Sequence, residues 1–419
     1  MRFYQDPSRQ IPIKKEADVL VVGGGPSGLS AAVAAARSGA RVILVERYGY
    51  LGGLATGGLV LYMEGVVDKE AKRAIGGIMW ETLERLKKVD GLVELRENEN
   101  PHVDSELLKF ISDELCLESS VEVMFHSLAV SVMADANSLA GIVVENKSGR
   151  QAIGAKIIVD CTGDGDIAAW AGAPFESGTR KIGLNMKIGG VNLIRKREFE
   201  RDNPEELKAL RSKMFSKGGM HIGTGPTPYS DSGVYWVNIS GLAGRKDQSE
   251  ASLSTINVDD LSFAEIELRR RLKISLDFHR ENIPGFEKLH LLALASQLGV
   301  RESRRIETTY RLLQSDIEEG KQFDDGIGAV AARVAGGGRY HVPFGSLVPS
   351  SLDDLLVAGR CLGSDHWSQN YIRLIPAAFM TGQAAGTAAA MSADKGIEPR
   401  DLDTAELRQR LKSENVILV

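Results

Sequence analysis

A glycine-rich turn between an apolar run and an alanine-rich segment is the feature that most constrains this chain. It lies in VLVVGGGPSGLSAAVAAARSGARVILVE, residues 19–46. Residues 19–22 are β-branched or leucine and too few for a surface helix, so they predict a buried strand of a parallel sheet. Residues 27–38 are rich in alanine and leucine and end before Gly39, which predicts a helix of about three turns. A second apolar strand follows over 41–45, so the segment predicts a β-α-β unit.

The glycines of this turn have the G-x-G-x-x-G spacing of a dinucleotide-binding fingerprint. Gly23 permits the sharp turn, Gly25 lets the backbone approach a pyrophosphate, and Gly28 lets the helix pack closely against the strand. Pro26 and Ser27 open the helix, and the unpaired N–H groups of its first turn favour a phosphate group. A bare fingerprint also occurs in other α/β proteins, but here a strand, a helix and a second strand surround it. We therefore interpret the segment as a dinucleotide-binding unit.

An acidic residue ends the second strand of this unit. Glu46 stands 18 positions beyond the last glycine, close to the spacing of about 20 at which a carboxylate accepts hydrogen bonds from a ribose. A second glycine-rich cluster, RYGYLGGLATGGLV, follows directly over 47–60. It is too irregular for a strand and too apolar for a solvent-exposed loop. We expect it to lie against a ligand or a domain seam.

Three parts of the chain resemble a known superfamily. The pattern G-G-G-P-x-G-L-x-A-A followed by E-R-x-G-x-L-G-G-x-x-T is similar to the N-terminus of FAD-dependent oxidoreductases of the glutathione-reductase-like flavoprotein superfamily. KIIVDCTGDGD at 156–166 is similar to the segment that passes under the FAD in these proteins. DLLVAGRCLGSDHWSQNYIRLIPAAFMTGQAAG at 354–386 is similar to their last strand and last helix.

Within that superfamily, the chain most resembles the poorly characterised group named simply FAD-dependent oxidoreductase. The resemblance covers residues 17–392 and includes LGVRESRRIETTY at 298–310, FDDGI at 323–327 and the segment PFGSLVP. These motifs are specific for the cofactor and carry little information about the substrate.

The resemblance implies FAD as the cofactor. In these flavoproteins the glycine after the last strand approaches the ribityl chain, and the last helix directs its N-terminus at the flavin pyrimidine edge. A strand of the meander contacts the adenine through its backbone, and we choose Val130 for this role. The residues expected to bind FAD are Gly23, Gly25, Pro26, Ser27, Gly28, Glu46, Arg47, Gly53, Leu54, Ala55, Thr56, Val130, Thr162, Gly163, Gly359, Arg360, Ile375 and Pro376.

The pattern along the whole chain predicts an α/β protein of two domains. Apolar periodicity predicts helices over 71–88 and 104–118, the second with Asp104 or Ser105 as its N-cap, and a β-meander over 121–159. We expect a Rossmann-like FAD-binding domain, with a parallel sheet and the β-meander, plus an inserted α+β substrate domain. The expected bounds are 17–174 and 341–396 for the discontinuous FAD-binding domain, 175–340 for the substrate domain and 397–419 for a C-terminal helical tail.

Composition excludes several classes of protein. The 419 residues are 43% apolar and carry a net charge of −5, with 51 basic and 56 acidic residues dispersed along the chain. No basic stripe indicates nucleic acid, and no apolar stretch is long enough to span a membrane. We therefore expect a soluble, cytoplasmic protein. The histidines lack metal-ligand spacing and no C-x-x-C motif is present, so we expect no metal site and no redox disulfide among Cys116, Cys161 and Cys361.

Three residues are the catalytic candidates. His366, just before the last helix, is a candidate base because histidine titrates near neutral pH, although a structural histidine is an equal alternative. Arg373 is expected to bind a substrate carboxylate or hydroxyl, with a buried acid or the FAD as alternative partners. Of the arginines in VRESRRIETTY we choose Arg301 to face the flavin cleft, and we expect Glu302 and Glu307 to pair with some of the others.

Four further residues bear on the same region. His341 is a weaker alternative to His366 as the base. Trp367, Asn370 and Tyr371 stand where relatives commonly carry other residues, small ones at the last two positions. The bulkier side chains suggest a changed or narrowed pocket.

The leading hypothesis is an FAD-dependent oxidoreductase, a dehydrogenase or oxidase that transfers a hydride between flavin N5 and a small organic substrate. Oxygen, a quinone, an electron-transfer flavoprotein and NAD(P)H remain open as the electron acceptor, and homo-oligomerisation is left open. One alternative is a non-redox biosynthetic enzyme of the thiazole-synthase type that keeps the nucleotide fold. Another is an RNA-modifying flavoprotein, against which the acidic charge balance counts.

Overall fold

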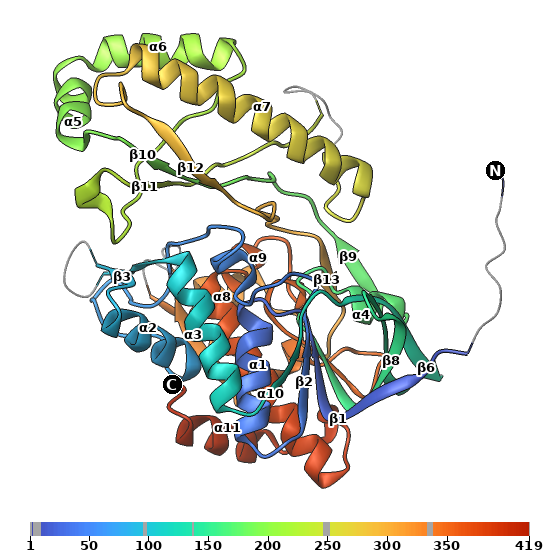
Figure 1. The fold of residues 1–419 in the computed structure, drawn as a ribbon. Coiled ribbons are helices and arrows are strands. Elements are labelled where there is room, and N and C mark those ends of the chain that lie inside the picture. The colour runs from blue at the N-terminus through green and yellow to red at the C-terminus, as the bar shows by residue number, and fades with distance from the viewer. Residues whose placement is uncertain are drawn as a thin grey trace.

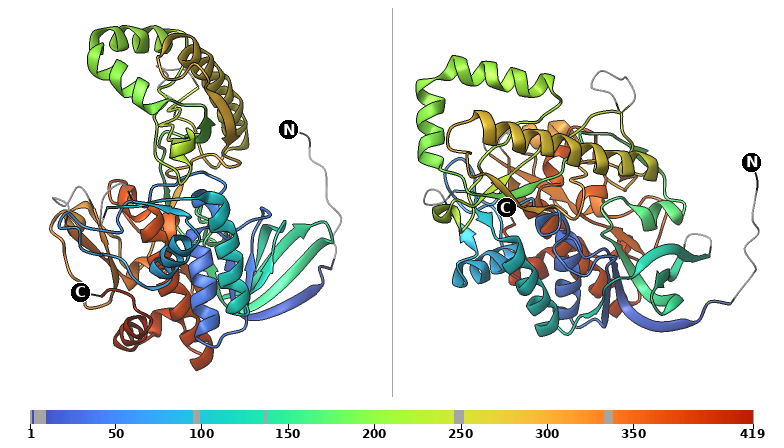
Figure 2. Two further views of the ribbon diagram at one scale, coloured as in Figure 1. Left: turned by 60° about the vertical axis from the view of Figure 1, so that its left-hand side comes forward. Right: turned by 45° about the horizontal axis from the view of Figure 1, so that its top comes forward.

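The computed structural model describes residues 2, 10–94, 99–135, 138–245, 252–332 and 338–418. The chain forms a larger body around a central sheet and a second layer set on one end of it (Figure 1). In the second layer, α7 lies along the outer face and a small sheet lies between α7 and the larger body (Figures 1 and 2).

The central sheet has seven strands in the order β5-β2-β1-β8-β7-β6, with β16 paired to β8 outside this path. β5, β2, β1, β8 and β16 run parallel, whereas β6, β7 and β8 form an antiparallel meander. The expected sheet and meander are therefore confirmed. The strands are β1 (Ile13–Val22), β2 (Val42–Val45), β5 (Glu122–Met124), β6 (Leu128–Asp135), β7 (Ser138–Asn146), β8 (Gly149–Asp160) and β16 (Leu355–Val357).

The predicted β-α-β unit is present as β1, α1 (Pro26–Arg37) and β2. Val22 is in register with Val45 on one side and with Asp160 on the other, and Asp160 is in register with Val357. The carboxyl ends of four parallel strands therefore meet at one edge of the sheet. In open α/β sheets this is the edge where ligands bind.

Helix α10 (Ile375–Lys395) packs against α1, and both lie beside the sheet in Figure 1. The two helices approach closely because α10 carries glycines at the crossing. A Cβ at Gly382 would overlap the carbonyl oxygen of Ser27, and a Cβ at Gly386 would overlap that of Ala31. The Ser30 hydroxyl donates across the crossing to the Phe379 carbonyl at 2.8 Å. This contact fixes the N-terminus of α10 relative to that of α1.

Two helices cover the α1 side of this body, α2 (Gly77–Lys88) and α3 (Ser105–Glu118). The Asp104 cap of α3 is confirmed, because its carboxylate accepts hydrogen bonds from the two following amides that a cap should satisfy. The helix predicted over 71–88 is wrong in its first turn and starts only at Gly77. Ala71 has a φ of +59°, which the interior of an α-helix cannot contain, and the first residue of α2, Gly77, still has a positive φ of +60°.

The second layer is a three-stranded antiparallel sheet, ordered β11-β10-β12, with three helices. Its hydrophobic core runs from Ile182 to Leu298 and also takes in Leu59 and Leu61 from the larger body. Its elements are β10 (Met186–Gly189), α5 (Leu193–Asp202), α6 (Pro204–Ser216), β11 (Tyr235–Val237), α7 (Val258–Asn282) and β12 (His290–Leu294).

The hydrophobic core of the second layer draws on a shorter part of the chain than the expected insert of 175–340. Ile306, Ile327 and Val342 belong to the core of the larger body, so the segment that follows β12 packs there. The remaining elements of the larger body are β3 (Leu92–Val93), β4 (His102–Val103), α4 (Asp166–Trp170), β9 (Phe175–Ser177), β13 (Arg304–Ile306), α8 (Gln314–Glu318), β14 (Gly326–Ala331), β15 (Arg339–Pro343), α9 (Gln369–Ile372) and α11 (Thr404–Ser413). Among the described residues, no helix combines the length and the apolar character needed to cross a membrane.

Candidate flavin site

The glycine-rich turn lies between the carboxyl ends of β1 and β8. Gly23 has a φ of +98°, and a Cβ there would lie 2.5 Å from the Cys161 carbonyl oxygen. A Cβ at Gly28 would overlap the carbonyl oxygen of Gly23. Both glycines are therefore required by the close packing of α1 on the sheet, as the fingerprint predicts.

Gly25 differs from the other two glycines because it faces open space. A Cβ built at this residue has no neighbour within 4 Å, and its backbone is extended, with φ −69° and ψ −173°. Gly25 is the N-cap of α1, where no side chain caps the helix, so the amides of the first turn remain available. The space in front of α1 is thus a cradle suited to a pyrophosphate.

Glu46 lies beside this cradle at the end of β2. Its side chain is buried and accepts hydrogen bonds from the amides of Gly24, at 2.6 Å, and Tyr48, at 2.8 Å. Burial raises the pKa of this carboxyl, while the two amides act in the opposite direction. Its backbone is bonded to Met124 and Ser127, which places the chain before β6 next to it. The carboxylate is therefore held where the fingerprint expects a ribose partner.

The second glycine cluster folds back on the cradle. The Gly52 amide donates to the Gly24 carbonyl at 2.8 Å, and a Cβ at Gly53 would lie 2.8 Å from the Gly25 Cα. Gly53–Ala55 form a 3₁₀ turn, which the Thr56 hydroxyl stabilises by donating to the Leu51 carbonyl at 2.6 Å. The loop thus packs on the fingerprint turn, as a segment lining the same ligand would.

The turn after β8 is organised by a buried carboxylate. Asp160 accepts hydrogen bonds from the Thr162 amide and hydroxyl and from the Ala168 amide. Burial raises the pKa of Asp160 to about 6. Gly163 follows with a φ of +77°, which a glycine tolerates best. Asp160 therefore has a structural role in shaping this turn.

Arg360 joins that turn to the base of the second layer. It donates to the Gly163 carbonyl at 2.8 Å, to the Val300 carbonyl at 2.5 Å and to the Asp164 carboxylate at 2.7 Å. The guanidinium that the sequence assigns to FAD is thus engaged with protein groups. Its assignment as an FAD-binding residue stays a prediction, as does that of Val130, which lies at an irregularity in the pairing of β6 with β7.

The last strand and the last helix reach the same edge of the sheet. Gly359 follows β16 with a φ of +78°, and a Cβ there would lie 2.7 Å from the Ser27 hydroxyl oxygen. Ile375 and Pro376 begin α10, whose first turn has no side-chain cap. The N-termini of α1 and α10 therefore both present free amides near the ends of the parallel strands. Phosphate and other electron-rich groups of a bound dinucleotide would find donors there.

His366 is bonded to a buried acid. Its Nδ1 lies 2.8 Å from Glu302 Oε1, and the imidazole is 57% exposed whereas Glu302 is fully buried. Glu302 also pairs with Arg180 and Arg305. A neutral imidazole with its proton on Nδ1 would donate to Glu302 and leave a free lone pair on Nε2. The geometry is therefore that of a carboxylate-oriented histidine.

The arginines of the VRESRRIETTY segment fall into two groups. Arg304 pairs with Asp166 at 2.7 Å and Arg305 pairs with Glu302 and Glu176, so pairing with acids is confirmed for these two. Glu307 is bonded to Ser350 instead, and we find no ion pair for it in the described chain.

Arg301 differs because its donors reach only backbone. They contact the carbonyls of Lys181, Ser240 and Ile239, which lie in the segments that connect the second layer. Arg301 therefore stabilises the base of the second layer without a counter-ion of its own.

Arg373 is the least satisfied cation of the site. Its Nε is buried without a partner, and it makes no hydrogen bond or ion pair with any described residue. Burial lowers its pKa to about 10, and Arg301, Arg180 and Arg360 act in the same direction. Arg373 ends α9, directly before α10. A buried guanidinium without a partner at this position can bind an anionic or polar ligand group.

Two contacts of this site, one made by Glu302 and one by Arg180, were not predicted from the sequence. Glu302 was expected to pair with an arginine, but its contact with His366 joins residues 64 positions apart. Arg180 had no motif around it, yet it bonds the His366 carbonyl and is among the cations that act on Arg373. His341 lies in β15, where burial lowers its pKa.

The three cysteines are free, buried thiols. Burial raises the pKa of all three, that of Cys116 to about 12. A thiol with a raised pKa is a poor nucleophile and a poor redox centre at neutral pH. Among the described residues, no group of three or more side chains is arranged to hold a metal ion.

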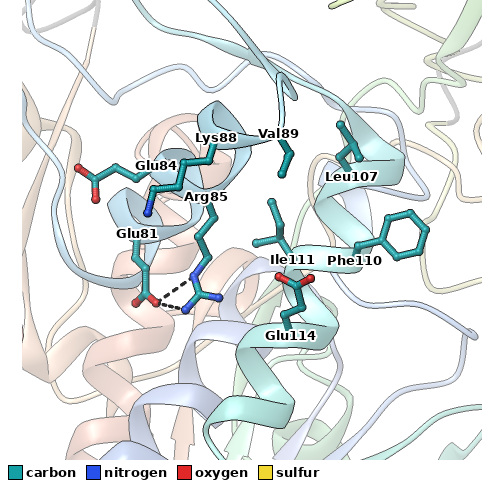
Figure 3. Close-up of a pocket in the computed structure, with 9 residues that line it drawn as sticks. All are labelled: Glu81, Glu84, Arg85, Lys88, Val89, Leu107, Phe110, Ile111 and Glu114. Atoms are coloured by element: carbon teal, nitrogen blue, oxygen red, sulfur yellow. Dashed lines mark hydrogen bonds and ion pairs between the residues drawn. The ribbon is translucent and has the colours of Figure 1, made fainter.

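A surface groove lies elsewhere, between α2 and α3 (Figure 3). It encloses about 610 Å³ and is lined by Glu81, Glu84, Arg85, Lys88, Val89, Leu107, Phe110, Ile111 and Glu114. Arg85 pairs with Glu81 along α2 at 2.8 Å, as the dashed lines show. No residue expected to bind FAD lines this groove.

The glycine turn, the buried acid and the free helix N-termini define a Rossmann-type dinucleotide-binding protein. Residues 18–411 match the family described as FAD dependent oxidoreductase. The chain belongs to this family, and its cofactor is FAD. The open cradle at Gly25 fits the pyrophosphate of that cofactor.

Other known proteins are similar in sequence to parts of this chain. A thiamine thiazole synthase of Methanococcus vannielii is 29% identical over 158 residues, which are 35% of this chain and 56% of that protein. A thiamine thiazole synthase of Saccharolobus islandicus is 31% identical over 214 residues, 48% of this chain and 72% of that protein. The chain therefore spans about half to three quarters of the length of these relatives.

Solved structures with a similar fold cover nearly the whole chain at low identity. A geranylgeranyl bacteriochlorophyll reductase-like protein of Thermoplasma acidophilum is 14% identical, with 95% of this chain and 83% of that chain covered and a TM-score of 0.47. A p-nitrophenol 4-monooxygenase of Pseudomonas putida is 12% identical, with 96% and 85% covered and a TM-score of 0.49.

Proposed function

We propose that the protein oxidises or reduces a small organic substrate by hydride transfer at flavin N5. When bound, FAD supplies a two-electron centre for such a reaction. The observation that carries the proposal is Arg373, whose buried Nε has no hydrogen-bond partner among the described residues and which directly precedes the N-terminus of α10. A redox enzyme of this kind needs a group that orients the substrate, and Arg373 is placed to do so.

His366 is the residue that we propose to move a proton. Glu302 holds the imidazole through Nδ1, so Nε2 is the atom that would accept a proton from a substrate hydroxyl or amine. Arg180 pairs with Glu302 and donates to the backbone carbonyl of His366, and these contacts fix the imidazole close to the Arg180 guanidinium. The proposal therefore assigns orientation to Arg373 and proton transfer to His366.

The test is an anaerobic screen of hydroxy acids, amino acids, sugars and amines against the purified yellow protein, with loss of flavin absorbance as the signal. Arg373→Met should stay folded and yellow but lose roughly a hundredfold in kcat/KM, because methionine keeps the length and removes the charge. Arg311→Met is the matched control, since Arg311 is half-exposed and pairs with Glu176. Normal kinetics in Arg373→Met would contradict the assigned role.

A second candidate function is favoured by the thiamine thiazole synthase relatives, which match up to 48% of this chain. An enzyme of that class would use the nucleotide site for biosynthesis without net flavin reduction. The colour of the protein separates the two functions. A purified protein that is yellow and is bleached by dithionite supports the redox function, and a colourless protein that carries a different nucleotide supports the alternative.

A further inference from the structure

The charges around Arg373 are unbalanced. Burial is the main influence on its pKa, and three neighbouring guanidinium groups, those of Arg301, Arg180 and Arg360, come next. One carboxylate, Glu64, acts in the opposite direction and has the smallest influence of the five. The surroundings of Arg373 are therefore strongly positive.

The partners of these four arginines show where the excess charge lies. Arg180 pairs with Glu302 at 3.0 Å, and Arg360 pairs with Asp164 at 2.7 Å. Arg301 and Arg373 have no carboxylate partner among the described residues, since Arg301 contacts carbonyls and Arg373 contacts none. Within the described part of the chain, the half-buried guanidinium groups of Arg301 and Arg373 thus have no carboxylate counter-ion.

An unpaired buried charge is costly, and a ligand of opposite charge removes most of that cost. The free amides at the start of α10 add further positive potential close to Arg373. The pyrophosphate cradle lies at the other helix, α1, where Gly25 leaves its space. An anion that pairs with Arg373 would therefore lie at the start of α10 and not in the pyrophosphate cradle.

Aromatic rings border the arginine cluster. Trp367 and Tyr371 have ring centroids 4.8 Å apart, and Tyr340 lies 6.4 Å from Tyr371. Tyr371 lies in α9, which Arg373 directly follows, so this ring and this guanidinium belong to the same short segment before α10. The Tyr340 hydroxyl is buried without a partner and is a second unsatisfied polar group there. Flat apolar surfaces of this kind contact an unsaturated or aromatic group well.

We propose that the substrate is an organic carboxylate with an aromatic body. Its carboxylate would bind Arg373, with Arg301 as the second cation, and its ring would lie against Trp367 and Tyr371. This inference rests on the proposed function and adds the chemical class of the substrate. The aromatic side chains of Trp367 and Tyr371 then have a role in specificity.

The experiment measures binding of three probes to the yellow protein under conditions without turnover. Phenylacetate carries both features, phenylacetamide lacks the charge and acetate lacks the ring. Binding is followed by the change in the visible spectrum of the flavin and, in the flavin-free protein, by the rise in unfolding temperature. We expect phenylacetate to bind roughly 10- to 100-fold more tightly than phenylacetamide, because a charge-assisted pair is lost, and more tightly than acetate. Equal affinity for phenylacetate and phenylacetamide would overturn the inference.

Variants test whether Arg373 causes the preference for phenylacetate. Arg373→Met should abolish the preference for phenylacetate over phenylacetamide, Arg373→Lys should restore part of it, and Arg311→Met should leave it unchanged. A preference that survives in Arg373→Met overturns the assignment. Loss of FAD in Arg373→Met, with phenylacetate still bound by the flavin-free variant, shows that the flavin is the counter-ion and also overturns it.

The two proposals fail in different ways. Absence of flavin reduction by any substrate contradicts the redox function, whatever the probes bind. Flavin reduction by neutral substrates alone, without a preference for carboxylates, leaves the redox function intact and contradicts the substrate class. If Arg373→Met does not fold, the comparison of phenylacetate with phenylacetamide in the unmodified protein still decides the inference.

Discussion

Gly25→Val should remove FAD while leaving the protein folded. The valine Cβ would have no protein neighbour within 4 Å, and φ −69° with ψ −173° suits a β-branched residue, so we expect no clash with the protein. Valine is a poorer N-cap than glycine, which costs about 1 kcal/mol and, in a chain of 419 residues, lowers the unfolding temperature by only about 1 °C. The added side chain fills the cradle in front of α1. Losing two charge-assisted hydrogen bonds there costs about 3–6 kcal/mol, or roughly a hundredfold to ten-thousandfold in affinity.

The assay compares flavin content after purification, FAD affinity of the flavin-free protein and unfolding temperature. Gly223→Val is the matched control, because Gly223 also has no neighbour within 4 Å but lies in the second layer. It should keep its flavin. Gly28→Ala is the opposite control and should lose both fold and flavin, since its Cβ would overlap the Gly23 carbonyl. Full flavin content in Gly25→Val would refute the placement of the pyrophosphate.

Three further predictions concern stability and the thiols. Gly382→Ala should lower the unfolding temperature by several degrees, because its Cβ would overlap the Ser27 carbonyl at the helix crossing. Gly154→Ala, whose Cβ would lie 3.5 Å from its nearest neighbour, should leave the unfolding temperature unchanged. Equal unfolding temperatures of the two variants would contradict this account of the crossing. Glu398 has a pKa raised to about 7 by burial and by Asp354, so its stabilising contribution is complete below pH 4.5 and is lost as the pH rises through 7. Glu398→Gln should therefore melt higher than the unmodified protein at pH 8 but not at pH 4.5, and a gain of equal size at both values would refute the pKa assignment. Replacing Cys116, Cys161 and Cys361 together by alanine should preserve flavin content and bleaching of the flavin by substrate. If dithionite still bleaches the flavin of this variant but the substrate does not, a thiol takes part in the reaction.

The sequence by itself determined the dinucleotide-binding half of the protein. The roles of Gly23, Gly25 and Gly28 follow from a spacing of a few residues, and the structure gives each glycine the environment that its role requires. The Asp104 cap was likewise predictable, because it acts on backbone amides within one turn, whereas the ribose role of Glu46 stays a prediction. Local backbone geometry depends on neighbouring residues, so a linear pattern is sufficient to predict it.

Only the tertiary structure decided how the candidate catalytic residues are partnered. Glu302 meets His366 across 64 positions, and the cations around Arg373 come from segments on both sides of the second layer. The helix expected over 71–88 is wrong at its start for a local reason, since a turn closed by the Val67–Arg73 bridge holds Ala71 at a positive φ. Charge pairing and burial depend on distances in space, and a one-dimensional pattern contains no information about which distant charges lack a partner. For this reason the sequence indicates the cofactor, whereas the folded chain shows that Arg373 has no partner among the described residues.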